Sequence, residues 1–260
     1  MSFDFELILF YAIIVCGVIA LFDIIFLAPK RQGTAKAGKV PLLVDYARSF
    51  LPVLVIVFLL RSFLFEPFRI PSGSLEPTLL TGDFILVNKY DYGIRLPILH
   101  TKVFGHSEPQ RGDIIVFRWP PNPSVDFIKR VIGLPGDHIS YIDKELYING
   151  KKMPQTFLQD ETARDENGIE WQAAEKEEDL SGIKHAIYLD PTTTSHDYHD
   201  IVVPKGMYFV MGDNRDKSAD SRYWGFVPDK EIVGKALVVW MSWNNADTKI
   251  RWDRLGTMIH

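Results

Sequence analysis

The chain has 260 residues, which is enough for one sizeable folded domain with accessory segments. Hydrophobic residues make up 47% and charged residues 24%, ordinary values for a globular chain. A net charge of −4 offers no basic surface for a nucleic acid, so the composition argues against a nucleic-acid-binding protein.

The first predicted element is a membrane-spanning helix over residues 7–27, in which Asp23 is the only formal charge. Because a helix rises about 1.5 Å per residue, this stretch crosses a hydrocarbon core of about 30 Å. A cleavable signal peptide is the alternative, but it needs a positively charged start and a shorter apolar region. The chain instead begins with Asp4 and Glu6 among its first residues. We therefore predict a helix that is retained in the membrane.

A second apolar run covers residues 49–65 and is interrupted only by Arg61, which can snorkel toward the membrane surface. A buried core helix is the alternative for the uncharged part of this run. The loop between the two runs, residues 28–48, carries five Lys and Arg side chains against Asp45 alone. The positive-inside rule places such a loop in the cytoplasm. We therefore predict a membrane anchor with two spans over residues 1–65.

Residues 66–260 are predicted to form an extracytoplasmic, mostly antiparallel β domain, folded as coiled sheets or a partial barrel. Its strands are predicted from short runs rich in β-branched or aromatic residues, at 84–87, 114–117, 127–132, 139–148, 207–211 and 232–243. The dipeptide Asn149-Gly150 is a strong hairpin signal. An accessory insertion is expected over residues 138–205. Its part 160–179 holds nine acidic side chains and is predicted to be a solvated segment that can include a short helix.

The segment that follows the second span, residues 70–77, carries two serines between two prolines. Pro71 and Pro77 disfavour helix and bias the residues before them to extended conformations. In an extended chain Ser72 and Ser74 project to the same side, so their hydroxyls lie side by side. A Ser/Gly/Pro linker that leaves the membrane is the alternative interpretation of this composition.

A serine nucleophile needs a base, and none of the seven histidines lies in a context typical of a catalytic triad. A G-x-S-x-G elbow is also absent from the sequence. Lys129 stands beside Arg130 in an apolar strand, where burial of either side chain would disfavour its charged form. Lysine can lose its proton in a protein and arginine cannot, so burial of Lys129 would create a base. The alternative places the Lys129 amine in solvent at a strand edge.

A third segment, residues 212–222, directly follows the predicted strand 207–211 and is dense in short polar side chains. Asp220 and Arg222 are spaced to form an ion pair, and Ser218 can orient a neighbouring amine. A solvated turn is the default interpretation of such a composition.

Together these segments resemble bacterial type I signal peptidase, or leader peptidase, a membrane-bound protease with a Ser/Lys dyad. The matching runs are P-S-G-S-L-E-P-T-L at 71–79, G-D-F-I-L-V at 82–87, R-G-D-I-I-V-F at 111–117, F-I-K-R-V-I-G-L-P-G-D at 127–137 and G-D-N-R-D-K-S-A-D-S-R-Y-W-G-F-V-P at 212–228. Their order, their spacing and the two leading spans also match. The resemblance covers nearly everything except the acidic insertion and the chain ends. Leu75 departs from it, since many relatives carry Met there, but this change conserves volume.

The resemblance implies that Ser74 is the nucleophile and Lys129 its general base. Ser72 would complete an oxyanion hole beside the Ser74 N–H, and Ser218 would hold the Lys129 amine. Neutral Lys129 would take the Ser74 proton, and Ser74 would attack the scissile carbonyl to form an acyl-enzyme. Water activated by the same lysine would then complete hydrolysis.

The resemblance also implies that Asp220 and Arg222 form a structural ion pair. Shallow pockets for small residues at positions −1 and −3 of the cleavage site would be lined by Phe68, Ile70, Leu79, Ile85, Val116 and Ile128. The implied substrates are signal peptides of secreted preproteins. The implied location is the phospholipid bilayer of the bacterial cytoplasmic (inner) membrane, with the catalytic domain on the periplasmic side. Neither a cofactor nor a metal is implied.

Three other functional interpretations of the sequence are alternatives to a signal peptidase. An S-x-x-K pattern occurs at Ser181 and Lys184, as in penicillin-recognising enzymes, but S-D-N and K-T-G are missing from the sequence. His196 and His199 are spaced like metal ligands, but H-E-x-x-H is absent from the sequence. The non-enzymatic alternative is a membrane-anchored β module that scaffolds exported proteins.

Overall fold

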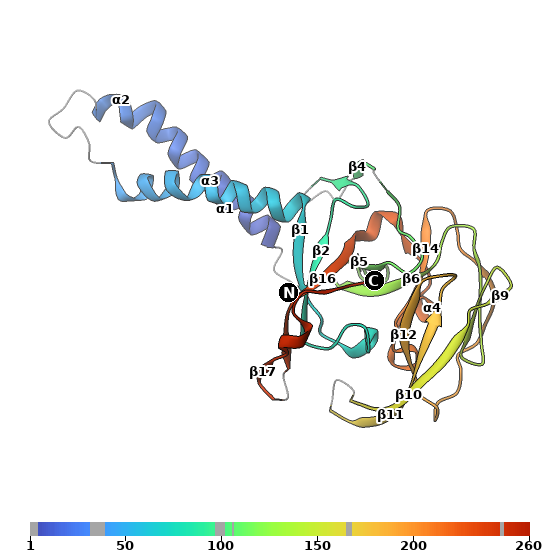
Figure 1. Ribbon diagram of the computed structural model, residues 1–260. Coiled ribbons are helices and arrows are strands. Elements are labelled where there is room, and N and C mark those ends of the chain that lie inside the picture. The colour runs from blue at the N-terminus through green and yellow to red at the C-terminus, as the bar shows by residue number, and fades with distance from the viewer. Residues whose placement is uncertain (1–4, 32–39, 97–101, 106, 165–167, 245–246) are drawn as a thin grey trace. The chain divides into compact units, whose positions relative to one another are not determined.

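The computed structural model describes residues 5–31, 40–96, 102–105, 107–164, 168–244 and 247–260. The chain divides into two compact units. One consists of Met1–Phe65 and Arg95–Val103, and the other of Glu66–Ile94 and Phe104–His260. The first holds the long helices, and the second holds the three larger sheets (Figure 1).

Two long apolar helices make up most of the first unit. Helix α1 (Phe5–Phe22) continues through a π-helical turn, η1 (Asp23–Leu27), into α2 (Ala28–Arg31). Helix α3 runs over Leu42–Phe63. Both stretches are long and apolar enough to cross a membrane, as the sequence predicts.

An ion pair joins the two helical stretches near the start of α3. Asp23 is fully buried, and its carboxylate lies 2.7 Å from Nη2 of Arg48 in α3. Ionisable side chains inside membrane segments are costly unless they pair in this way. Helix α3 starts at Leu42, directly after Pro41 in a non-helical conformation, and so earlier than the predicted start at residue 49.

The largest sheet of the second unit is open and mostly antiparallel. Its strand order is β1-β2-β16-β5-β6-β14-β15, with β17 and β18 also pairing with β16. The bounds are β1 Phe65–Arg69, β2 Asp83–Asn88, β5 Ile114–Arg118, β6 Asp126–Gly133, β14 Met207–Met211, β15 Val227–Pro228, β16 Ile232–Asn244, β17 Lys249–Ile250 and β18 Thr257–Met258. The pairings around β16, β5, β6 and β14 are antiparallel. The β domain is confirmed, and its sheets do not close into a barrel.

Strand β5 shows why this sheet forms the core. Its residues 114–117 are all apolar, and all are buried. Ile114 and Val116 pack in one apolar cluster, whereas Ile115 and Phe117 pack in another on the opposite face. A strand covered on both faces is expected to be continuously apolar, not alternating.

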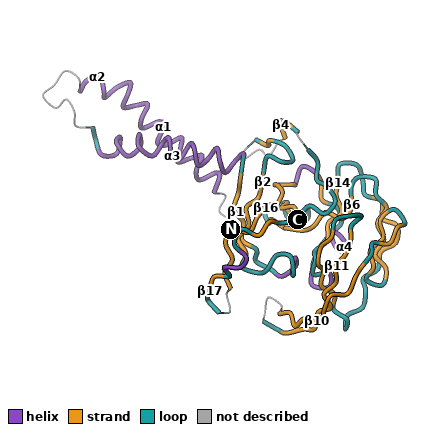
Figure 2. Tube along the Cα trace, in the orientation of Figure 1, coloured by secondary structure: helices purple, strands orange, loops and turns teal. Residues whose placement is uncertain are grey.

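The remaining sheets of the described chain are smaller, and Figure 2 shows strands and loops in separate colours. They comprise β3 Ile94–Arg95, β4 Lys102–Phe104, β7 His138–Ile142, β8 Glu145–Ile148, β9 Lys151–Lys152, β10 Gln155–Arg164, β11 Glu170–Asp179, β12 Lys184–Leu189 and β13 Tyr198–Val202. The hairpin prediction is confirmed, because Ile148 pairs with Lys151 across Asn149-Gly150. Both loop residues have positive φ, 52° and 75°, as a type I′ turn requires.

The acidic segment is not helical where the structure describes it. Residues 155–164 and 170–179 form the antiparallel strands β10 and β11, with Ala163 opposite Trp171. Most of its carboxylates are at least partly exposed, but Glu178 is fully buried against Arg215. Pairing with β12 on the other side makes β11 the central strand of three. Tertiary contacts thus override the low strand propensity of acidic residues.

The remaining helical elements of the described chain are short. They are η2 Gly73–Leu75, η3 Arg215–Lys217, α4 Ser221–Trp224, η4 Asp229–Glu231 and η5 Trp252–Arg254. Two of them, η2 and η3, lie in segments 70–77 and 212–222, in which the sequence predicts candidate site residues.

Candidate active site

Ser74 lies in a short 3₁₀ turn that the core holds in place. The turn η2 spans Gly73–Leu75, so the extended conformation expected here stops at Ser72. Leu75 and Leu79 are fully buried in the core cluster that also contains residues of β2 and β5. The apolar side chain after Ser74 therefore fixes the turn, while the Ser74 hydroxyl faces a pocket.

The structure brings Ser74 and Lys129 together across 55 residues of sequence. Lys129 Nζ lies 2.6 Å from Ser74 Oγ, within hydrogen-bond distance. Lys129 stands in β6 opposite Ile115 of β5, which fixes its position along the sheet. Ser72 Oγ lies 3.4 Å from Ser74 Oγ, so the two hydroxyls do lie side by side.

The Lys129 amine is buried without a nearby carboxylate. Burial lowers its pKa to about 8, although the more distant Asp220 and Asp213 oppose this shift. Within the described chain no carboxylate forms an ion pair with Lys129, and its Nζ lies 5.5 Å from the centre of the Phe127 ring. A lysine with this pKa is neutral in a useful fraction of molecules near neutral pH.

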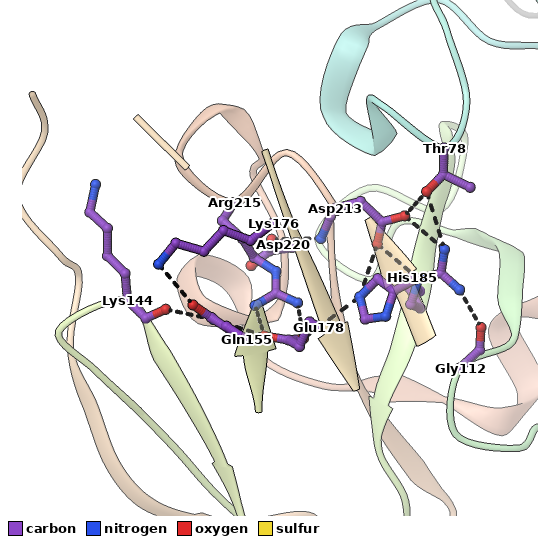
Figure 3. A network of polar contacts seen from close by, with 12 residues as sticks. Thr78, Gly112, Lys144, Gln155, Lys176, Glu178, His185, Asp213, Arg215 and Asp220 are labelled. Carbon is purple, nitrogen blue, oxygen red and sulfur yellow. Dashed lines mark hydrogen bonds and ion pairs between the residues drawn. The ribbon is translucent and has the colours of Figure 1, made fainter. Parts of the chain in front are cut away.

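The adjacent cation, Arg130, is buried but fully paired. Its Nε and Nη2 each donate to Asp213 at 2.8 Å, and its Nη1 donates to the carbonyl oxygens of Gly112 and His260 at 2.8 Å. Asp213 also accepts a hydrogen bond of 2.6 Å from Thr78 (Figure 3). Of these two neighbouring residues of β6, Arg130 therefore keeps its proton and is paired with a carboxylate, whereas Lys129 is unpaired and can lose its proton.

The turn over residues 212–222 is held by a buried ion pair. Arg222 donates to the two carboxylate oxygens of Asp220 at 2.8 and 2.9 Å. Asp220 also accepts a 2.9 Å hydrogen bond from the Gly212 N–H. Burial opposes the charge of Asp220, but Arg222 and this hydrogen bond hold its pKa below the usual range. The geometry matches the structural role that the sequence suggested for the pair.

A second buried ion pair joins the same turn to β11. Arg215 donates to both carboxylate oxygens of Glu178, one of them at 2.9 Å (Figure 3). Gln155 of β10 donates to Glu178 at 3.1 Å. His185 lies 3.6 Å from Glu178 and 3.8 Å from Asp213, and burial followed by the charge of Arg130 lowers its pKa to about 4. His185 is thus a neutral structural residue, and Ser74 is paired with Lys129 instead.

Ser218 is placed near the dyad but is not bonded to it. Its side chain is buried, and its hydroxyl makes no hydrogen bond within the described residues. It packs against Gly212, where a Cβ atom would lie 2.3 Å from both Ser218 Oγ and the Ser74 carbonyl oxygen. The expected bond to the Lys129 amine therefore requires a movement of Ser218 or of the amine.

Gly212 emerges as a residue on which the site depends. We expect Gly212→Ala to displace the Ser74 backbone, to destabilise the fold by about 1–3 kcal/mol, and to lower kcat strongly. Thermal unfolding and a cleavage assay measure the two effects. Gly206→Ala is the control, because its Cβ meets open space and only the positive φ of 72° is strained. Wild-type cleavage by Gly212→Ala would show that the close approach is unimportant.

A pocket of about 590 Å³ opens beside the dyad. The pocket is lined by residues 71–74 and 125–129. It is also lined by Asn214, Lys217 and Ala219 of the turn over residues 212–222. Arg164 of β10 and Trp171 of β11 complete the lining. The pocket therefore combines groups from five separate segments of the chain.

The residues predicted for the substrate pocket have mixed positions. Ile128 lines the pocket and packs partly against the core. The others do not line this pocket: Ile70, Leu79, Ile85 and Val116 are buried in the core cluster, and Phe68 is partly buried against that cluster.

Sequence reasoning missed several residues of the site. Asn214 donates from Nδ2 to the Gly73 carbonyl at 3.1 Å and from its N–H to the Ser74 carbonyl at 3.2 Å. Asn214 could have been proposed as a site residue from the sequence, because it lies in the polar segment 212–222. Trp171 and Arg164 could not be predicted as site residues, because they lie in the acidic segment, whose composition is typical of a solvated surface.

The rival S-x-x-K pattern has no catalytic geometry. Lys184 is largely exposed, and its amine lies 2.7 Å from Glu177, which raises the Lys184 pKa. Ser181 stands in a turn with a positive φ of 60° and contacts Met153. A lysine held in its charged form by a carboxylate is a poor general base.

Comparison with known proteins gives consistent matches. The family model described as "Signal peptidase, peptidase S26" matches residues 43–243, which include every site residue above. A signal peptidase I of Pseudomonas fluorescens is 48% identical over 271 residues, and one of Pseudomonas aeruginosa is 45% identical over 271 residues. Both alignments cover 94% of this chain and 94% of the relative. A crystal structure of a signal peptidase I from Enterococcus faecalis V583 is 34% identical, covers 50% of this chain and 97% of that chain, and has a TM-score of 0.30.

Proposed function

This chain belongs to the signal peptidase family, peptidase S26, and we propose that Ser74 and Lys129 form the dyad with which it cleaves signal peptides. The observation that carries the proposal is the 2.6 Å separation of Lys129 Nζ and Ser74 Oγ. A buried amine with a pKa of about 8 can accept the serine proton, so no histidine is required.

The reaction is an acyl transfer in two stages. Lys129 accepts the Ser74 proton while Ser74 Oγ attacks the scissile carbonyl, and the negative charge develops on the carbonyl oxygen. The Ser74 N–H and the Ser72 hydroxyl stabilise this oxyanion. The Lys129 ammonium then gives its proton to the departing amine of the mature protein. Water, deprotonated by the same lysine, releases the signal peptide from Ser74.

The free edge of β6 gives the substrate a place to bind. Along the described chain, β14 pairs with Arg130, Val131 and Gly133 of β6, and residues 126–129 pair with β5 on the other side. The unpaired edge of residues 126–129 faces the pocket and can take an extended peptide as an added strand. Ile128 then contributes an apolar surface for small side chains before the scissile bond.

The membrane topology is part of the same proposal. Residues 1–65 anchor the protein by two spans in the bacterial cytoplasmic (inner) membrane, with loop 28–48 in the cytoplasm. Residues 66–260 form the catalytic domain on the periplasmic side, with the accessory insertion at about 138–205. We expect protease added to spheroplasts to digest the catalytic domain and to spare a tag placed in the loop. Digestion of that tag alone would reverse the topology.

Cleavage of a precursor tests the function itself. We expect the purified full-length protein in detergent to cut a preprotein once and release the mature chain, identified by its mass. If no precursor is cut under any detergent or lipid condition, the alternative of a membrane-anchored scaffold for exported proteins is favoured. The proposal includes no cofactor or metal, so a chelator should leave the rate unchanged.

A further inference from the structure

The pocket continues beyond the dyad onto a cationic and aromatic wall that the proposed mechanism does not use. This wall consists of Arg164, Trp171 and Lys217. Lys217 Nζ lies 5.3 Å from the centre of the Trp171 ring, a distance typical of a cation–π contact. Asp126, the one carboxylate among the described lining residues, belongs to the β6 side of the pocket.

The strand pairing of β6 shows which part of a substrate reaches this wall. Residues 126–129 have a free edge, but from Arg130 onward β14 occupies it. The nucleophile meets Lys129 at the end of that free edge. A peptide that pairs with residues 126–128 before its scissile bond must therefore leave the edge immediately after the bond. Because the turn that carries Lys217 lines the same pocket, this continuation can reach it.

Both cations of the wall can exchange their present partners for a ligand. Arg164 donates to Glu170 at 2.7 and 3.1 Å, but both side chains are more than half exposed. Lys217 lies 3.8 Å from Asp190, at the limit of an ion pair, and is itself 40% exposed. The exposed Arg164–Glu170 pair contributes little free energy, and the 3.8 Å contact of Lys217 with the buried Asp190 is long, so a bound carboxylate can compete for either cation.

We propose that Arg164, Trp171 and Lys217 form a subsite for the mature side of the substrate, which favours an acidic side chain within the first few residues after the scissile bond. The inference rests on the proposed function, because it takes the scissile bond to lie at Ser74. Lys217 is the principal residue of the subsite, since the Trp171 ring holds it over the pocket. Arg164 extends the positive charge along β10.

A matched set of precursors tests this subsite. The precursors share one signal peptide and carry Glu, Gln or Lys at one of the second to fourth mature positions, and the full-length protein in detergent is assayed for kcat/KM. We expect the wild type to prefer Glu over Lys by about fivefold at one of these positions. Lys217→Glu should abolish this preference, Arg164→Glu with Lys217→Glu should reverse it, and Lys217→Arg should keep it.

One control variant separates a local effect of Lys217 from a long-range effect of charge. Lys205→Glu makes the same change in net charge at an exposed lysine outside the pocket lining. An equal change of the Glu/Lys ratio in Lys205→Glu would assign the effect to long-range charge and overturn the subsite. Equal rates for Glu, Gln and Lys precursors, or a charge preference only before the scissile bond, would overturn it too. If the wild type cleaves none of the precursors, it is the proposed function that fails.

Discussion

Replacing Ser74 by alanine should lower kcat for precursor cleavage by about 10⁴-fold or more, because it removes the group that forms the acyl-enzyme. The variant should remain folded. Leu75 and Leu79, which anchor the turn in the core, are unchanged, and the lost hydroxyl faces the pocket. Initial rates on one precursor and a thermal unfolding curve measure both properties.

Ser72→Ala is the matched control for this variant. It removes a hydroxyl 3.4 Å away but leaves the nucleophile and its base in place. Loss of one oxyanion donor costs about 10²–10³-fold in rate in other hydrolases, less than loss of a nucleophile. Substantial cleavage by Ser74→Ala, or an equal loss in the two variants, would contradict the assignment of Ser74.

Replacing Lys129 by methionine should abolish cleavage and at the same time stabilise the protein near neutral pH. The amine is almost completely buried, and burial lowers its pKa from 10.5 to about 8. A shift of this size corresponds to about 3 kcal/mol of destabilisation below pH 8. The lost hydrogen bond to Ser74 offsets about 1 kcal/mol of the gain. Methionine fills a similar volume without a charge.

The pH dependence of stability gives this prediction its sign. Between about pH 8 and 10.5 the unfolded lysine binds a proton that the folded lysine has lost. The free energy of unfolding of the wild type therefore receives an increasing contribution from Lys129 as pH rises through this range. Lys129→Met should lack that contribution. Urea unfolding of both proteins at pH 7 and pH 10 measures the difference, and an equal pH dependence in the two would contradict the burial of the amine.

Arg130→Met is the control at the neighbouring position. Arg130 is as buried as Lys129 but is paired with Asp213, so its removal leaves a buried carboxylate without its partner. Such a loss typically costs about 3–5 kcal/mol. We therefore expect Lys129→Met to raise and Arg130→Met to lower the free energy of unfolding near neutral pH, because only Arg130 is paired with a carboxylate. Lys129→Arg should also be inactive, because arginine keeps its proton.

Local sequence features pointed to the residues that the structure brings together at the candidate site, and the family resemblance gave the roles proposed for them. The contrast between Lys129 and Arg130 follows from general properties of the two side chains, and the structure buries both. The Ser72–Ser74 pair follows from chain geometry, although a 3₁₀ turn replaces part of the expected extended run. These inferences needed no knowledge of distant contacts.

Features that depend on long-range contacts could not be predicted in the same way. The acidic strands β10 and β11 are stabilised by pairing with each other and with β12, and by the Glu178–Arg215 ion pair. The pairing of Arg48 in α3 with Asp23 joins two segments that are far apart in the sequence. Trp171 reaches the pocket only because β11 is placed there by the fold. No local pattern of residues records any of these contacts.

The pH dependence of kcat/KM for the wild-type protein tests the Ser/Lys dyad most directly. If neutral Lys129 is the base, the rate should rise with pH through an apparent pKa of about 8, because the amine must lose its proton in the free enzyme. The same full-length protein and a single precursor suffice for this measurement. A rise centred near pH 6.5, as a histidine base would give, or a rate independent of pH between 6 and 9, would contradict the dyad.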